Sequence, residues 1–340
     1  MIEIDGSCGE GGGQILRTAL GLSVVTGQGF RMHSIRANRP KPGLAAQHLA
    51  GIMAVLEASS AQVSGAALGS RDLEFVPGEE WKSDLEINVG TAGSISLVLQ
   101  ALMLASVGKN LKAEIIGGTD VRMSPPIGYL QHVLLPLLEK MGVDGEAEVL
   151  ARGFYPEGGG KVAIDISSRL PLAPIHLGRT TGRPRIYAEG VTQNLPTHVC
   201  NRMAMSFKKH IVASGGAEAR CLETRGLSTG AGLTVWADFG ETWLGADALG
   251  ERGVPAERVG ELAAEKLMTL ISSGAGADEH AADHLLPYMA LAAAPSSMLV
   301  REMTPHMETQ METISLFLPA RIAVEGRGDL FRVQVDPNRT

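Results

Sequence analysis

The sequence is poor in aromatic residues and has no long apolar run. Aromatic residues make up only 4% of the 340 positions, so a core of this size has to be built mainly from Ala, Val, Leu, Ile and Met. No apolar run reaches the roughly 18 residues that a membrane-spanning helix needs. No cationic segment followed by an apolar stretch precedes the first strand-like residues either. We therefore expect a soluble globular protein without a signal peptide or membrane association.

Cysteine is also scarce. Cys8, Cys200 and Cys221 are odd in number and widely spaced, which favours reduced thiols over a disulfide framework. Reduced thiols are typical of the cytosol, so we expect a cytoplasmic protein. Cys8 lies in a glycine-rich loop before a helix, where a thiol can be activated. Without a neighbouring base, a small packing residue is the simpler interpretation.

An excess of positive charge is missing as well. The net charge of −7 argues against a protein that coats long nucleic acids, because phosphate binding of that kind needs an extended basic surface. A local basic site remains, since Arg36, Arg39 and Lys41 place three cations within six residues. This segment is either a phosphate-binding loop or a solvated basic loop, and its composition fits both equally well.

The two common glycine-rich nucleotide motifs, GxxxxGK[ST] and GxGxxG, are absent, but a different glycine-rich loop precedes a predicted helix over 14–26. Its sequence, DGSCGEGGGQ over 5–14, leaves backbone N–H groups at a helix start, which favour an anion. Glu10 could hold Mg²⁺ bound to nucleotide phosphates, and Arg17 could reach the same anion from the next turn. The alternatives are a solvent-facing turn residue and a surface salt bridge.

The sequence contains three similar units, each expected to form a helix, a strand, a loop and a second helix before its closing strands. The second helices of the first two units carry the same dipeptide, Gln47-His48 and Gln131-His132. For the third, more divergent unit we expect a helix, a strand, a loop and a helix over 279–293, 298–303, 304–309 and 310–318. Three copies predict a pseudo-threefold arrangement.

The segment 178–273 has a different character and is flanked by Gly- and Pro-rich stretches typical of linkers. We interpret it as an inserted small α/β domain. The fold class is therefore α/β (α+β), with a large domain of three βαβαββ-like repeats formed by 1–177 and 274–340.

Equivalent loops of pseudo-symmetric units should meet on one face. The loops before the three second helices carry mainly cations in the first unit, an acid and prolines in the second, and a histidine in the third; their chemical residues are Arg36, Arg39 and Lys41, then Asp120, Arg122 and Pro125, then His306 and Glu308. This set predicts a phosphate-handling centre. The triple glycine of 158–160 is different, since removing every side chain before a strand favours close backbone packing and a structural role.

Five segments together resemble the RNA 3′-terminal phosphate cyclase family. They are GEGGGQILR at 9–17, IRANRPKPGLAAQH at 35–48, GGTDVRMSPP at 117–126, RGFYPEGGGKV at 152–162 and PHMET at 305–309. The resemblance runs through all three repeats and the inserted segment, so it covers nearly the whole chain.

The resemblance implies a three-step reaction on ATP and RNA 3′-phosphate ends. A histidine attacks the α-phosphate of ATP and releases pyrophosphate, AMP passes to the RNA 3′-phosphate, and the 2′-hydroxyl closes a 2′,3′-cyclic phosphate. His306 matches the nucleophile, and Glu10 matches the acid that binds Mg²⁺ or Mn²⁺. Residues matching the family's phosphate-binding positions, or adjacent to them, are Gln14, Arg17, Arg36, Arg39 and Gln47. Those matching its nucleotide pocket are Gln100, Pro125, His280, Asp283 and His284.

Two positions depart from the family pattern. Where relatives commonly have Tyr-x-x-Asp-Gln, this chain has His280, Asp283 and His284, so adenine would stack on an imidazole. His280 and His284 also share a helix face and could instead bind a transition metal. Thr309 is followed by Gln310 where relatives often have Asn, which affects the orientation of His306.

Three other kinds of protein fit the sequence less well. A binding protein of the same fold, such as a ribosome-assembly scaffold, would lack the nucleophile that His306 supplies. Enolpyruvyl transferases share similar repeats but are longer, and ligases that use lysine in a KxDG motif are disfavoured because Lys82-Ser-Asp-Leu85 lacks the glycine. The sequence is compatible with a homo-oligomer.

Overall fold

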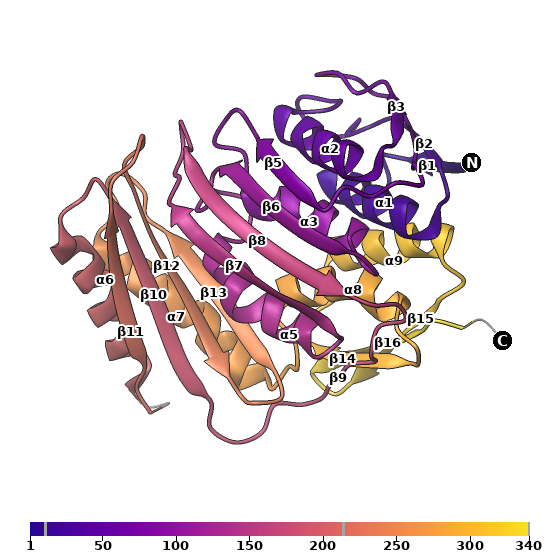
Figure 1. The fold of residues 1–340 in the computed structure, drawn as a ribbon. Helices are drawn as coiled ribbons and strands as arrows, with labels where there is room; N and C mark the ends of the chain where they lie inside the picture. The colour runs from indigo at the N-terminus through magenta and orange to yellow at the C-terminus, as the bar shows by residue number, and fades with distance from the viewer. Residues whose placement is uncertain (10–11, 213–214, 339–340) are drawn as a thin grey trace.

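The computed structural model describes residues 1–9, 12–212 and 215–338, and it confirms the expected mixed α/β fold. These residues form four small four-stranded sheets with helices packed on them (Figure 1). Three of the sheets come from the repeats and the fourth from the inserted segment. Within the described residues, no helix combines the length and apolar composition needed to cross a bilayer.

The first repeat forms one sheet in the order β1-β2-β4-β3. Helix α1 ends at Gly27, whose φ of 70° is a left-handed conformation that favours glycine. The elements of this repeat are β1 (Ile2–Asp5), α1 (Gly13–Thr26), β2 (Phe30–His33), α2 (Ala46–Ser59), β3 (Gln62–Ser64) and β4 (Leu73–Val76).

The second repeat has the same topology, in the order β5-β6-β8-β7. Its second helix differs, because a π-helical segment interrupts it at the Gln131-His132 dipeptide. The elements are β5 (Asp84–Asn88), α3 (Ile95–Ala105), β6 (Asn110–Gly117), α4 (Ile127–Tyr129), η1 (Leu130–Leu134), α5 (Leu135–Glu139), β7 (Val143–Ala151) and β8 (Gly160–Ser168).

The third repeat repeats this order once more, as β9-β14-β16-β15. The inserted segment leaves after β9, so it interrupts the third repeat rather than separating it from the second. The elements are β9 (His176–Leu177), α8 (Glu279–Ala290), β14 (Ser296–Val300), α9 (Pro305–Phe317), β15 (Arg321–Arg327) and β16 (Leu330–Asp336).

In each repeat the first two strands of the sheet are parallel and the remaining pairs antiparallel. Buried and exposed residues alternate along β5 and most of β6, so one face of the sheet packs on helices and the other faces solvent. Helix α1 packs against both α3 and α9, which joins the three repeats in a shared apolar core. This arrangement brings the starts of α1 and α9 together.

The inserted segment forms its own sheet in the order β11-β10-β12-β13, with α6 and α7 packed on it. A separate apolar cluster that includes Met203, Phe207, Val235 and Leu267 fills the space between sheet and helices. This cluster supports a distinct unit, while the boundaries at 178 and 273 stay a prediction. Its elements are β10 (Arg185–Gln193), α6 (Thr197–His210), β11 (Glu218–Thr224), β12 (Gly230–Asp238), β13 (Trp243–Leu249) and α7 (Ala256–Ser273).

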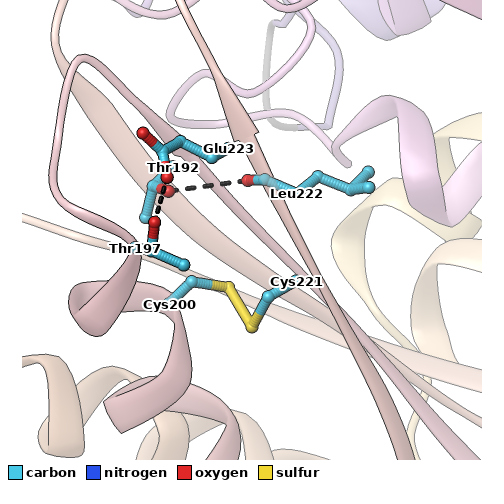
Figure 2. Close-up of a disulfide and its surroundings, with 6 residues drawn as sticks. All are labelled: Thr192, Thr197, Cys200, Cys221, Leu222 and Glu223. Atoms are coloured by element: carbon cyan, nitrogen blue, oxygen red, sulfur yellow. Dashed lines mark hydrogen bonds between the residues drawn. A yellow bond between two sulfur atoms is a disulfide. The ribbon is translucent and has the colours of Figure 1, made fainter.

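The prediction of reduced cysteines is wrong for two of the three. Cys200 on α6 and Cys221 on β11 form a disulfide, with their Cα atoms 5.8 Å apart (Figure 2). They are 21 residues apart in sequence, and only the folding of β11 beside α6 makes them neighbours. Cys8 is unpaired and exposed, and slight burial together with Asp5 and Glu312 raises its pKa. That direction is opposite to an activated thiol.

A second correction concerns the segment 304–309, which was expected to be a loop. Helix α9 already begins at Pro305, because Pro is favoured in the first turn and Thr304 caps the helix by accepting a hydrogen bond from the N–H of Met307 at 3.2 Å. His306 therefore lies in the first turn of a helix.

Candidate active site

The start of α1 is shaped for an anion. Its N-cap residue, Gly12, supplies no side-chain hydrogen bond, so the first backbone N–H groups lack the cap that Thr304 gives α9. A Cβ at Gly13 would collide with the ring of His48, and one at Gly12 would lie 3.5 Å from Nη2 of Arg39. The bare glycine backbone thus lies directly beneath a histidine and an arginine.

The basic loop of the first repeat is held close to this helix start. The N–H of Arg36 donates to the carbonyl of Gly6 at 3.3 Å, and the side chain of Asn38 donates to the carbonyl of Ser7 at 3.0 Å. Arg36 adopts a φ of 54° and donates from Nη1 to the carbonyl of Gly43 at 2.7 Å. Partial burial and the neighbouring Arg39 lower the pKa of Arg36. Like charges are therefore gathered here, as an anion site requires.

Arg17 extends the positive charge along α1. Its Nε donates to Oε1 of Gln100 on α3 at 2.6 Å. Burial lowers the pKa of Arg17 to about 10, although the carboxylate of Asp283 acts in the opposite direction, so the guanidinium stays charged near neutral pH.

His48 packs against Gly13 at the start of α1. Its Nδ1 accepts a hydrogen bond from the N–H of Ala45 at 3.1 Å, which fixes the ring at the start of α2. Burial and the charges of Arg17 and Arg36 lower the pKa of His48 to about 3. The ring is therefore neutral at physiological pH and adds no charge to the site.

Buried hydrogen bonds of two glutamine side chains connect three helices next to Arg17. Gln14 on α1 donates to Oδ1 of Asp283 on α8, and Gln310 on α9 donates from Nε2 to the main-chain carbonyl of Asp283 at 3.2 Å. Gln310 in turn accepts a hydrogen bond from Thr18 on α1. Gln310, which stands where relatives often have Asn, thus links α1, α8 and α9 and fixes the position of α9.

His306 is exposed to solvent in the first turn of α9, one turn before the buried Gln310. Gly9 packs so closely on Thr309, one turn further along, that a Cβ at Gly9 would overlap the threonine hydroxyl. Burial, His280, Arg17 and His306 together lower the pKa of His284 to about 3. The glycine-rich loop thus lies between the turn of α9 that carries His306, through Gly9 and Thr309, and the arginine-bearing loop, through Gly12 and Arg39.

Gln100, Pro125 and His284 line one small cavity of about 20 Å³, which has room for about one water. Ser96 holds the Pro125 segment by donating to its carbonyl at 2.6 Å. His280 lies outside this cavity, but its ring contacts Tyr129 edge-to-face, with 5.7 Å between ring centres, and Tyr129 lines it. A nucleobase could enter only with movement of these side chains. The roles of these residues stay predictions.

The structure does not test the predicted roles of two site residues, Gln47 and Glu10. Gln47 starts α2 and faces the Gly93 loop, where a Cβ added to Gly93 would lie 3.7 Å from Cβ of Gln47. Glu10 lies outside the described residues, so the structure does not test its predicted metal role. Within the part of the chain that the structure describes, no group of three His, Cys, Asp or Glu side chains could hold a metal ion. The alternative metal site at His280, Asp283 and His284 therefore gains no support.

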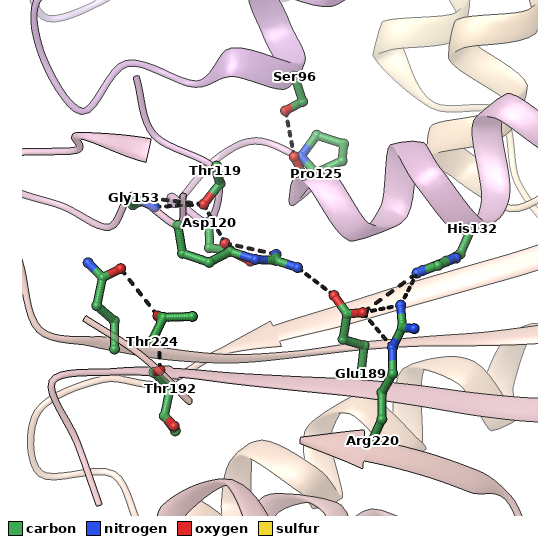
Figure 3. A network of polar contacts seen from close by, with 12 residues as sticks. Ser96, Thr119, Asp120, Pro125, His132, Gly153, Glu189, Thr192, Arg220 and Thr224 are labelled. Atoms are coloured by element: carbon green, nitrogen blue, oxygen red, sulfur yellow. Dashed lines mark hydrogen bonds and ion pairs between the residues drawn. The ribbon is translucent and has the colours of Figure 1, made fainter. Parts of the chain in front are cut away.

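The second repeat contributes less to this site than expected. Asp120 is buried and pairs with Arg152 at 3.3 Å, and Arg122 pairs with Glu251 of the inserted unit at 2.8 Å. Of the residues singled out in this loop, only Pro125 reaches the cavity described above. The structure does not bring Asp120 and Arg122 to the phosphate centre: Asp120 belongs to the buried polar network of Figure 3, and Arg122 pairs with the inserted unit.

The glycine-rich segment 152–162 packs against neighbouring backbone. Gly153 lies against Gly117 and Gly160 so closely that a Cβ would clash with their main-chain atoms. The N–H of Glu157 donates to Oγ of Ser228 in the inserted unit at 3.0 Å, and Gly159 contacts Leu227 there. These contacts support a structural role, as the sequence predicts.

Sequence reasoning did not assign roles to Thr18 or to the Gly9–Thr309 contact. Thr18 follows Arg17 on a buried helix, so a polar residue there was a signal for a buried partner. The partner itself is 292 positions away, and only the packing of α1 on α9 reveals it.

Comparison with known proteins gives a consistent result. The model of the family described as "RNA 3'-terminal phosphate cyclase" matches residues 8–324. The chain is 44% identical over 332 residues to an RNA 3'-terminal phosphate cyclase of Thermococcus kodakarensis, covering 96% of this chain and 95% of the relative. It is 44% identical to one of Caldivirga maquilingensis (99% and 98% covered) and 42% identical to one of Nitrosospira multiformis (99% and 97% covered).

Proposed function

Because this chain belongs to the RNA 3′-terminal phosphate cyclase family, we propose that it uses ATP to convert an RNA 3′-terminal phosphate to a 2′,3′-cyclic phosphate. The observation that carries the proposal is the packing of Gly9, in the glycine-rich loop, on Thr309 in the turn of α9 that carries His306, with Arg17 and His306 both close enough to His284 to act on its pKa. A nucleophile beside two helix starts and a cluster of arginines suits attack on a phosphate.

In the first step a ring nitrogen of His306 attacks the α-phosphorus of ATP. A P–N bond forms, the bond to the bridging oxygen breaks, and pyrophosphate leaves with the electron pair. The resulting phosphoramidate divides one difficult condensation into two easier transfers.

The arginines stabilise the charge that develops on the phosphate oxygens. Arg39 lies over Gly12 and Arg17 lies beside Gly13, so both can face an anion bound at the start of α1. Arg36 adds charge to the loop that carries Arg39, and Gln47 lies nearby at the start of α2. Neutral His48 fills the space beside Gly13 without adding a further cation.

The base of ATP would lie between Pro125 and His280, with Gln100 at its edge. Gln14 orients Asp283 for a contact to the nucleotide. Mg²⁺ or Mn²⁺, held by Glu10, would neutralise the pyrophosphate that leaves. These assignments follow the family pattern, position by position.

In the second step an oxygen of the RNA 3′-phosphate attacks the phosphorus of the histidine-bound AMP, and the imidazole leaves. In the third step the vicinal 2′-hydroxyl attacks the 3′-phosphorus, its proton is lost to solvent, and AMP leaves. The product is the 2′,3′-cyclic phosphate.

The first step can be tested without RNA. The purified chain, incubated with α-labelled ATP and Mg²⁺ or Mn²⁺, should acquire an acid-labile, alkali-stable label. His306→Ala should reduce labelling by about 10⁴-fold or more, because a covalent nucleophile has no substitute. His176→Ala, an exposed histidine on β9, is the matched control and should label normally.

Labelling that persists in His306→Ala would refute the assignment. If the wild-type chain takes up no label with either metal and forms no cyclic phosphate on RNA, the alternative of a binding protein of the same fold is favoured instead.

A further inference from the structure

A second, larger cavity of about 370 Å³ lies between the inserted unit and the third repeat. Asp247 on β13 and Lys266 on α7 line it from the inserted unit, and Glu279, His280 and Arg301 line it from the third repeat. It shares no lining residue with the cavity formed by Gln100, Pro125 and His284. The Tyr129–His280 ring contact lies between the two.

The walls of this cavity are rigidly connected. Asp278 caps α8 by accepting hydrogen bonds from the N–H groups of His280 at 3.0 Å and Ala281 at 2.9 Å. It also accepts one from the N–H of Gly245 on β13 at 2.9 Å and one from Tyr129 at 2.6 Å. Asp278 therefore fixes the position of His280 relative to the strand that carries Asp247.

Asp247 presents an unused acceptor to the cavity. Within the described residues its carboxylate makes no hydrogen bond or ion pair, and Lys266 donates to the main-chain carbonyl of Asp247 at 2.7 Å instead. Burial raises the pKa of Asp247, while Lys266 and His280 act against that rise. Among the described residues no buried side-chain oxygen lacks a partner, so the Asp247 oxygens are open to the cavity, where a ligand can supply a donor.

A second group in this cavity suits a flat ligand. His280 is exposed at the rim and offers a flat ring for stacking. The rest of the lining carries both signs of charge, with Lys266 beside Glu265 and Arg301 paired with Glu279 at 2.6 Å. The Asp247 carboxylate and the exposed His280 ring, in a space of this size, fit a base that donates hydrogen bonds.

We propose that this cavity binds the terminal base of the RNA substrate and that Asp247 selects bases with an exocyclic amino group. Asp247 accepts hydrogen bonds from the amino group of adenine, cytosine or guanine. Uracil offers only its ring N3–H, flanked by two carbonyl oxygens that repel a carboxylate, and is disfavoured. The base stacks on the face of His280 turned away from ATP. This inference rests on the proposed function and gives the inserted unit a role in substrate choice.

The experiment compares four RNA oligonucleotides that differ only in the 3′-terminal nucleotide, each ending in a 3′-phosphate. Binding is measured by fluorescence anisotropy and cyclisation by KM and kcat. The wild-type chain should prefer the A, C and G ends over U by about tenfold in binding and in KM, the size of a base contact. Asp247→Asn should lose most of this preference, while labelling by ATP alone keeps its rate and its ATP dependence.

Asp144→Asn, an exposed aspartate on β7, is the matched control and should keep the preference. Equal Tm values for the three proteins exclude misfolding as the cause. The same end preference in Asp247→Asn as in the wild type overturns the proposal. So does an altered ATP dependence of labelling with unchanged RNA preference, which would assign the cavity to the base of ATP. If the wild-type chain takes up no label, only the proposed function fails, because anisotropy still reports the end preference.

Discussion

Two loops at the same place in the first and second repeats are used in opposite ways. The loop over 36–43 keeps its arginines close together over the start of α1, even though their mutual repulsion and burial lower the pKa of Arg36. The loop over 117–126 pairs its charges instead, Asp120 with Arg152 and Arg122 with Glu251. A repeated backbone thus gives one site for an external anion and one junction between parts of the same chain.

The paired dipeptides in the second helices show the same contrast. His48 faces Gly13 and Arg17 inside the candidate site. His132 lies in the π-helical segment, stacks on Trp236 of the inserted unit with 4.1 Å between ring centres, and lies 3.8 Å from Glu189. Equivalent residues therefore share a position in the fold but not a function.

The largest expected effect comes from breaking the junction. Glu189 on β10 is buried and pairs with Arg152 at 2.6 Å and with Arg220. Burial alone would raise its pKa, but the hydrogen bond with His132 and the charges of Arg152 and Arg220 hold it at about 2. Glu189→Ala leaves the buried Arg152 poorly compensated and should cost about 3–5 kcal/mol of unfolding free energy. Urea unfolding followed by circular dichroism measures this loss.

Arg220→Ala is the matched change on the solvent side of the same network. The Arg220 side chain is 59% exposed, and Glu189 keeps Arg152, so the loss should be at most about 1 kcal/mol. Equal losses for Glu189→Ala and Arg220→Ala would mean that the network is not organised around a buried carboxylate.

The second effect is catalytic and tests the contrast between the loops directly. Arg39→Ala removes a cation above the start of α1 and should slow labelling by ATP about 100-fold, the usual cost of losing one charge-stabilising donor. Arg122→Ala removes the corresponding charge from the loop of the second repeat, where Glu251 already neutralises it, and should change the rate less than twofold. Comparable losses in both variants would show that both loops serve the nucleotide.

Much of this organisation could be predicted from the sequence, because repeats leave a periodic pattern. The order of helices and strands in each repeat and the inserted segment follow from apolar periodicity and turn residues. The meeting of the Arg36–Gly43 loop, the start of α1 and His306 follows from the pseudo-symmetry of the repeats. A loop was expected before α9, but capping by Thr304 with Pro305 in the first turn starts the helix earlier.

The contacts that could not be predicted join residues far apart in the sequence. The pairing of Cys200 with Cys221 depends on how α6 packs beside β11, and the pairing of Arg122 with Glu251 depends on how the inserted unit meets the second repeat. No local pattern encodes either arrangement. Pseudo-symmetry even misled the interpretation of Asp120, because it describes where a loop lies and not what its charges contact.

The smallest expected effect concerns His48 and the pH dependence of stability. Its pKa is about 3 in the folded chain, below its ordinary value of 6.5, because the ring is buried beside Arg17 and Arg36. Between these two values the unfolded chain binds the proton and the folded chain does not, so stability is lost as the pH falls below 6.5. One such group costs up to about 1.4 kcal/mol per pH unit.

His48→Gln should therefore flatten the fall in unfolding free energy between pH 7 and pH 5, measured by urea unfolding. His284, shifted in the same direction, keeps part of the slope. An unchanged slope in His48→Gln, with His176→Gln as control, would mean that the His48 ring is in contact with solvent. His48 would then not be a buried neutral residue beside Gly13, and the two loops would differ only in their arginines.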